Sequence, residues 1–67
     1  MKNTIRTLRQ KKKISQEELA RLCGVTRQTI NAIENDKYDP TLSLAFKLSK
    51  NLSTTVDRLF IFEEESK

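Results

Sequence analysis

Apolar residues recur at intervals of three and four along most of the chain, the spacing that puts side chains on one face of an α-helix. Residues that favour helix N-caps stand just before these apolar repeats. A single Gly and a single Pro among 67 residues leave few interruptions. The pattern therefore predicts an all-α domain whose five helices begin near residues 4, 16, 27, 42 and 56.

The strongest local signal for a helix start is the run Ser15-Gln16-Glu17-Glu18. It is a capping box, in which the Ser hydroxyl and the Glu three residues later bond backbone amides at the helix N-terminus. The helix is predicted over residues 16–23 and ends at Gly24, because glycine tolerates the positive φ of a helix C-terminus. Ala20 is small enough for another helix to cross close to it.

Thr26 is placed to cap a second helix directly after this turn. The second helix is predicted over residues 27–35, with Ile30 and Ile33 on the face that packs against the first helix. Two short helices joined by about three residues that include a glycine are the sequence form of a helix-turn-helix motif. The motif is therefore predicted over residues 15–35.

The second half of the chain is predicted to complete the core. Pro40 ends the polar loop that follows the motif, and Thr41 caps the next helix. Thr55 caps a last short helix, and Glu63–Glu65 are predicted to form a solvated tail. The apolar face of the helix after Thr41 is predicted from Leu42, Ala45, Leu48 and Leu52, with Leu44 and Phe46 widening the apolar surface.

Positive charge is concentrated in the first half of the chain. The whole sequence has 13 Lys and Arg residues against 9 Asp and Glu residues, a net charge of +4. Residues 1–37 alone carry +5, and residues 38–67 carry −1. A basic half of this kind suits a polyanion such as nucleic acid, and a merely solvated surface is the alternative.

The residue types argue against an enzyme and against a metal site. The chain has no His and one Cys, so it offers no histidine base, no internal disulfide and no zinc site. A domain of 67 residues is short for a deep pocket or a small-molecule effector domain, and Cys23 is expected to be a small core residue. No membrane span or export signal is apparent, so a cytoplasmic protein without cofactors is expected.

At these residues the chain resembles the phage-repressor-type, or Cro-like (XRE), helix-turn-helix family. The resemblance covers nearly the whole chain as a single domain over residues 1–67, and it is greatest for short stand-alone repressors such as the cytolysin repressor. Those are five-helix domains that dimerise and add a small antiparallel sheet, which the resemblance implies for Met1–Asn3 and Phe60–Glu64. The matching residues are Ile14–Ala20, Gly24–Ile30, Ile33–Asn35 and the run Pro40-Thr41-Leu42 with the apolar positions from Ala45 to Phe60.

The resemblance also implies which residues contact DNA. In this family the second helix of the motif lies in the major groove, with its N-terminal residues at the base edges. Arg can bond guanine O6 and N7 together, and Gln or Asn can bond adenine N6 and N7. The expected base-contacting residues are Arg27, Gln28, Thr29 and Asn31. The expected backbone-contacting residues are Gln16, Thr26, Lys37, Tyr38, Thr41 and Ser43.

The sequence therefore predicts a sequence-specific DNA-binding transcriptional regulator, a repressor that binds an inverted-repeat operator as a homodimer. The alternative is an antitoxin-type interaction module that sequesters a toxin and autoregulates its operon. Single residues also have alternatives, a solvated helix position for Arg27 and packing over the fourth helix for Tyr38. The dimer interface is expected in the apolar C-terminal third, at Val56, Leu59, Phe60 and Phe62 with Leu52 or Phe46.

Overall fold

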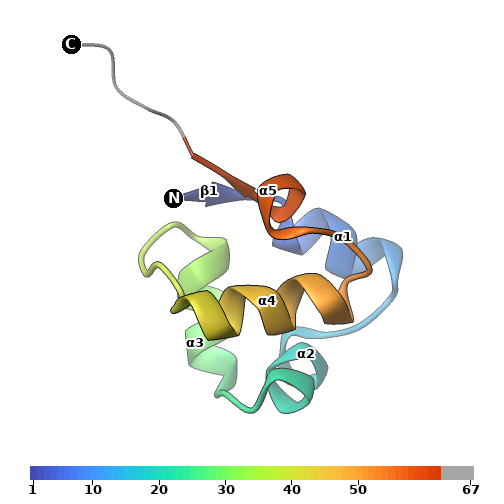
Figure 1. The fold of residues 1–67 in the computed structure, drawn as a ribbon. Helices are drawn as coiled ribbons and strands as arrows, with labels where there is room; N and C mark the ends of the chain where they lie inside the picture. Colours follow the sequence, from blue (N-terminus) through green and yellow to red (C-terminus); the bar gives the residue numbers. More distant parts are fainter. Residues whose placement is uncertain (63–67) are drawn as a thin grey trace, which may run out of the picture.

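The computed structural model describes residues 1–62, which form five short helices and one two-stranded sheet (Figure 1). The five-helix fold and the small sheet are therefore confirmed. The tail predicted at Glu63–Glu65, and the end of the strand predicted to reach Glu64, lie outside the described residues. In chain order the elements are β1 (Lys2–Asn3), α1 (Ile5–Lys11), α2 (Gln16–Cys23), α3 (Arg27–Glu34), α4 (Leu42–Asn51), α5 (Val56–Leu59) and β2 (Phe60–Ile61).

The sheet holds the two ends of the described chain together. Its strands are antiparallel, with Asn3 opposite Phe60. The Thr4 amide extends the pairing by donating to the Leu59 carbonyl oxygen at 2.9 Å. Because each strand has only two residues, the main effect of the sheet is to hold the start of α1 beside α5 (Figure 1).

Polar side chains begin three of the helices as predicted. Such N-caps typically stabilise a helix by about 1 kcal/mol. The second half of the predicted capping box is not formed, because the Glu18 carboxylate accepts from Arg21 instead of the Ser15 amide. Thr55 occupies the N-cap of α5 without a capping hydrogen bond. The hydroxyls that do cap accept from the backbone amide three residues later, Ser15 from Glu18 at 3.0 Å, Thr26 from Thr29 at 3.3 Å and Thr41 from Leu44 at 3.2 Å.

The turn between α2 and α3 depends on Gly24. Its φ is 72°, in the left-handed region, as predicted for the residue that ends α2. The next residue, Val25, closes the turn by donating its amide to the Ala20 carbonyl oxygen at 3.0 Å. A Cβ added at Gly24 would meet no atom within 4 Å, so glycine is favoured here by backbone conformation alone.

The core contains apolar residues from every helix. α2 packs against α3, and α4 packs against α2 on one side and α5 on the other (Figure 1). Ala20 is 3% exposed, which agrees with the predicted close approach of another helix at this position. The buried apolar residues are Ile5, Leu19, Ala20, Cys23, Ile30, Ile33, Leu44, Ala45, Leu48, Leu52, Leu59 and Phe60.

The buried face of α4 differs from the prediction. Leu42, predicted to lie on this face, is 69% exposed, because the residues that point inward are Leu44 and Leu48 together with Ala45 and Ser49. The Ser49 hydroxyl donates to the Ala45 carbonyl oxygen at 2.9 Å, so this buried polar group is satisfied. Phe46, predicted to widen the apolar surface, faces outward as well, and its side chain is 59% exposed.

The prediction for the last apolar residues needs a similar correction. Leu59 is completely buried and Phe60 is 8% exposed within the monomer, so neither offers a surface to a partner. Val56 is half-buried against the core, whereas Phe62 is 73% exposed. Leu59 and Phe60 belong to the core because α5 packs against α4 and leads straight into the strand that pairs with β1.

Candidate nucleic-acid interface

Three polar side chains project from the outer face of α3. Arg27, Gln28 and Asn31 are exposed, while Ile30 and Ile33 on the opposite face are buried in the core. Residues four apart on a helix are neighbours on its surface, so Asn31 follows Arg27 one turn along the same face. The structure therefore brings three of the four predicted base-contacting residues together on one accessible surface.

The fourth predicted base-contacting residue, Thr29, is engaged within the first turn of α3. Its hydroxyl lies 3.1 Å from the hydroxyl of Thr26, and its amide donates to the same Thr26 oxygen. Thr29 is also half-buried. These contacts give Thr29 a structural role, in shaping the helix start, that the sequence pattern did not predict.

The loop after α3 and the start of α4 carry exposed groups suited to a sugar-phosphate backbone. Lys37 is exposed, and its amide is held near α3 by donating to the Ala32 carbonyl oxygen at 2.9 Å. Tyr38, for which packing over α4 was the alternative, is 48% exposed. Thr41 and Ser43 are exposed too, although the Thr41 hydroxyl is already used to cap α4.

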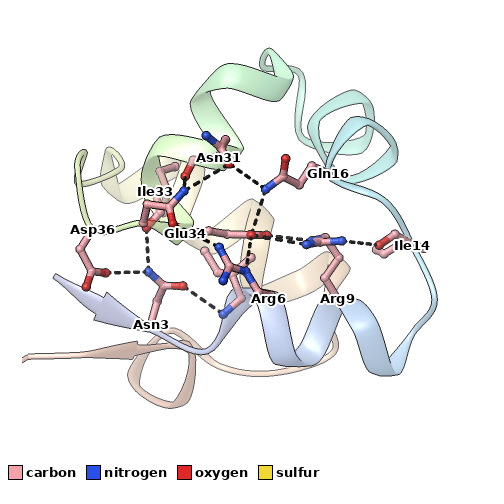
Figure 2. Close-up of polar contacts among 11 residues, drawn as sticks. Asn3, Arg6, Arg9, Ile14, Gln16, Asn31, Ile33, Glu34 and Asp36 are labelled. Atoms are coloured by element: carbon pink, nitrogen blue, oxygen red, sulfur yellow. Dashed lines mark hydrogen bonds and ion pairs between the residues drawn. The ribbon is translucent and has the colours of Figure 1, made fainter.

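A buried carboxylate, Glu34, lies where α3 meets α1 and α2 (Figure 2). Its side chain is 0% exposed. Arg9 donates to it twice, from Nε to Oε2 at 2.8 Å and from Nη2 to Oε1 at 3.4 Å. The Nε2 of Gln16 donates to Oε1 at 3.0 Å, and the Nε of Arg6 donates to the same oxygen at 3.3 Å. Glu34 thus joins α3 to the first two helices.

The charge state of Glu34 follows from these contacts. Burial is the largest single influence and raises the pKa of Glu34, but the hydrogen bonds from Arg9, Gln16 and Arg6, with the charge of Arg9, together outweigh it. The net pKa of Glu34 is therefore lowered, and the carboxylate is ionised at neutral pH. An ionised carboxylate can only accept hydrogen bonds, so its neighbours have to present donors.

Gln16 connects Glu34 to the outer face of α3. Its Nε2 donates to Glu34 and also to the Oδ1 of Asn31 at 3.1 Å. Figure 2 shows the Gln16 oxygen turned away from both partners. Gln16 was predicted to contact a phosphate. Its NH2 group is the only part of the side chain that could donate to a phosphate, and this group already bonds Glu34 and Asn31 within the protein.

Sequence reasoning missed the pair formed by Arg9 and Glu34. The signal was present, because Arg9 lies four residues after Ile5 and Glu34 lies four residues after Ile30. Both charged residues therefore share a helix face with a core residue, and their charges are opposite. A charged side chain that is buried requires a partner of opposite charge. Two oppositely charged residues on inward helix faces can therefore be recognised in a sequence as a candidate buried ion pair.

Asn3, expected from the resemblance as part of the first strand, also makes contacts that the sequence did not predict. Its Oδ1 accepts from the Ile5 amide at 3.1 Å at the start of α1. Its Nδ2 donates to the Ile33 carbonyl oxygen at 2.8 Å near the end of α3 (Figure 2). This one side chain therefore fixes the C-terminal end of α3 against the N-terminal end of α1.

Metal clusters and membrane-spanning helices are absent from the described part of the chain. Within residues 1–62, no group of Cys, Asp or Glu side chains is arranged to hold a metal ion. None of the helices in that range has the length and apolar character needed to cross a membrane. Cys23 is a core residue as predicted, and burial raises the pKa of its thiol.

Comparisons with known proteins agree with this geometry. The profile of the family described as helix-turn-helix matches residues 5–59. The chain is 46% identical to an uncharacterised HTH-type transcriptional regulator from Methanocaldococcus jannaschii, over 97% of this chain and 98% of that protein. It is also 46% identical to the uncharacterised HTH-type transcriptional regulator YgzD from Bacillus subtilis, over 98% of this chain and all of YgzD. A restriction-modification controller protein from Aeromonas hydrophila has a similar structure, with a TM-score of 0.77 and 34% identity over 84% of this chain and 85% of that one.

Proposed function

The chain belongs to the helix-turn-helix family of DNA-binding transcriptional regulators, and we propose that it represses transcription as a homodimer bound to an inverted-repeat operator. The observation that carries this proposal is the exposed polar face of α3, where Arg27, Gln28 and Asn31 are free of the core. These are the residue types that read base edges in the major groove. Lys37 and Tyr38 in the following loop would contact the sugar-phosphate backbone beside the groove.

Two copies are needed because one short helix reads only a few base pairs. A site read by a single α3 would recur too often in a genome to act as an operator. A two-fold dimer would place its two α3 helices about 34 Å apart, one turn of DNA, and would require an inverted repeat. Two bound domains would also cover a promoter and exclude the polymerase, which is why we favour repression.

The surface for the second copy is a patch that we call the apolar face, formed by Leu42, Phe46, Ile61 and Phe62. Their exposed fractions are 69%, 59%, 45% and 73%, high values for large apolar side chains. Large apolar side chains exposed to this degree are typical of interaction sites. A surface pocket of about 260 Å³, lined by Leu42, Val56 and Phe60 among others, adjoins it and could receive a side chain of the partner.

The position of the apolar face is compatible with DNA binding. β2 lies at the opposite end of the domain from the turn between α2 and α3 (Figure 1). The N-terminal end of α3 would therefore stay free for the major groove. This interface differs from the one expected from the sequence. It keeps Phe62 and Phe46, leaves out the core residues Leu59 and Phe60, and adds the exposed residues Leu42 and Ile61.

Selection of bound fragments from a random DNA pool tests the proposed DNA recognition. We expect one enriched motif with two inverted half-sites whose centres are about 10 base pairs apart. A motif without inverted symmetry would contradict dimeric binding. Enrichment of no motif at all would contradict sequence-specific recognition.

Sedimentation at micromolar concentration tests the dimer independently. Phe62→Glu should convert a wild-type dimer into monomers, because it places a charge within the proposed contact. Leu22→Glu is the control, since Leu22 is another large apolar residue that is exposed, but it lies on α2 outside the apolar face. A wild-type monomer would favour the alternative of an antitoxin-type module, in which the same apolar face binds a different protein.

A further inference from the structure

The side chain of Asn31 is held in an orientation that limits which bases it can read. We propose that Glu34, acting through Gln16, turns the Asn31 amide so that it offers DNA only its NH2 group, and that Asn31 therefore prefers guanine, the base with two acceptors in the major groove. This inference rests on the proposed DNA binding by α3 and adds a rule for one base position. It assigns Gln16 a positioning role in place of the phosphate contact expected from the sequence.

The Glu34 carboxylate determines the orientation of the Gln16 side-chain amide. Glu34 is buried and ionised, so the Gln16 group that faces it must be the donor Nε2. An amide nitrogen carries two hydrogens, and Nε2 uses one toward Glu34 and the other toward Asn31, at 3.0 and 3.1 Å. The buried carboxylate therefore determines which end of Gln16 meets Asn31.

Gln16 in turn determines the orientation of the Asn31 side-chain amide. Because Gln16 presents a donor, the Asn31 atom facing it must be the acceptor Oδ1. The Nδ2 of Asn35 donates to the same oxygen at 3.2 Å and to the Asn31 backbone carbonyl oxygen at 2.8 Å. An amide oxygen has two lone pairs, and both are occupied here. Figure 2 shows the Asn31 nitrogen pointing away from Gln16, where it remains available.

The bases differ in the donors and acceptors that they present to Asn31 in the major groove. An unconstrained Asn reads adenine with two bonds, accepting from N6 and donating to N7. With its oxygen occupied, Asn31 cannot accept from an amino group, so it loses the bond to adenine N6 and has none for cytosine N4. Guanine O6 and thymine O4 are acceptors at the same edge, and guanine N7 adds another. Adenine keeps only its N7 acceptor, so the expected order is guanine first, thymine and adenine next with one acceptor each, and cytosine last.

Gln28 provides an internal comparison on the same helix. Its side chain is exposed, and none of its amide atoms bonds another residue in the described range. Gln28 therefore keeps both its acceptor and its donor, and it can still read adenine with two bonds. The two neighbouring amides of α3 should consequently differ in the bases they select.

Selection from a random DNA pool, with the wild type and Asn31→Ala, identifies the base position that depends on Asn31. At that position the wild type should prefer guanine over adenine by about threefold to tenfold, the value of one neutral hydrogen bond. A wild-type preference for adenine or cytosine there would overturn the proposal. So would an Asn31→Ala variant whose preferences match the wild type at every position.

Two further variants test the roles of the oxygen and of Gln16. Asn31→Asp keeps the shape but replaces the outward donor with an acceptor, so the preference should invert toward cytosine and adenine. Gln16→Ala frees one lone pair of Oδ1, while the other still accepts from Asn35, so adenine regains its second bond and should rise to parity with guanine. The exposed Gln10→Ala serves as the control with unchanged preference. Thermal unfolding of each variant confirms that it is folded.

The outcomes separate this inference from the proposed function. If Gln16→Ala weakens binding to all sequences alike and keeps the wild-type preference, Gln16 is a phosphate contact and the positioning role is wrong. If the wild type enriches no motif, the proposed function fails instead. A motif that keeps its inverted repeat, but has adenine at the Asn31 position, contradicts the polarity rule alone.

Discussion

Removing Arg9 should destabilise the domain more than removing any of its exposed charges. Arg9 is 13% exposed and makes two hydrogen bonds to Glu34, which is completely buried. Its Nη1 also donates to the Ile14 carbonyl oxygen at 3.0 Å, at the connection into α2. Arg9→Met keeps much of the side-chain volume and leaves the carboxylate with donors from Gln16 and Arg6 only.

The magnitude follows from the burial of the carboxylate. Breaking a buried ion pair costs about 3–5 kcal/mol when the remaining charge has no other partner. Because Gln16 and Arg6 still donate to Glu34, we expect a loss of about 2–3 kcal/mol at pH 7. A domain of this size has a total stability of roughly 3–10 kcal/mol, so the variant should be close to its unfolding threshold. The melting temperature should fall by roughly 10–20 °C.

Urea unfolding at fixed protein concentration measures the effect, and Arg6→Met is the matched control. Arg6 bonds the same carboxylate, but it is 54% exposed, so its loss should cost less than about 1 kcal/mol. The lowered pKa of Glu34 stabilises the wild type above the ordinary carboxyl range, and this stabilisation is lost as the pH falls through the folded-state pKa. The difference between the wild type and Arg9→Met should therefore be largest at pH 7 and should decrease as the pH is lowered to 3.

Equal losses for Arg9→Met and Arg6→Met would refute the reasoning, because they would mean that burial does not strengthen the contact with Glu34. A loss for Arg9→Met that is the same at pH 7 and pH 3 would refute it as well. In that case Arg9 would act through packing or through its bond to Ile14, and the charge of Glu34 would not be involved.

Three further outcomes are expected. Gly24→Ala should lose about 1 kcal/mol in urea unfolding, because alanine is strained at a φ of 72°. Ser53→Gly should instead gain stability, because Ser53 has a φ of 57°. A Gly24→Ala variant of unchanged stability would show that the turn relaxes easily. Ala20→Leu should lose about 1–3 kcal/mol by overpacking a site that is 3% exposed, and an unchanged melting temperature would contradict the close approach of helices there. Lys37→Ala should weaken binding to all DNA sequences alike and reduce the salt slope of log K by about 0.9 for each phosphate that is no longer neutralised. Arg27→Ala should instead cost about 1–3 kcal/mol of discrimination at one base. Titration of an operator at several salt concentrations distinguishes the two variants.

Local sequence determined the helices, their starts and the motif. Ser15, Thr26 and Thr41 cap the helices that they were predicted to cap, and Gly24 ends α2 in the left-handed conformation. These features depend on residues within one turn of each other, so the chain around them is enough to specify them. The inward face of α3 was also predictable, because Ile30 and Ile33 define it by spacing alone.

The tertiary structure decided which apolar residues near the end of the chain are core and which are surface. Leu42 and Phe62 are as apolar as Leu59 and Phe60, yet the first two are exposed and the last two are buried. Spacing cannot separate these residues, because their burial depends on how α4 turns against α2 and α5 and on the pairing of β2 with β1.

The polar contacts between α3 and the first two helices likewise depend on the tertiary structure. Gln16, Asn31 and Glu34 are up to 18 positions apart in the chain, and Arg9 is 25 positions from Glu34. The sequence showed that Asn31 and Gln28 are both exposed amides on one helix, and nothing in it distinguishes them. The distinction arises because packing buries Glu34, burial of a charge requires donors, and the donor that Gln16 supplies is shared with the oxygen of Asn31.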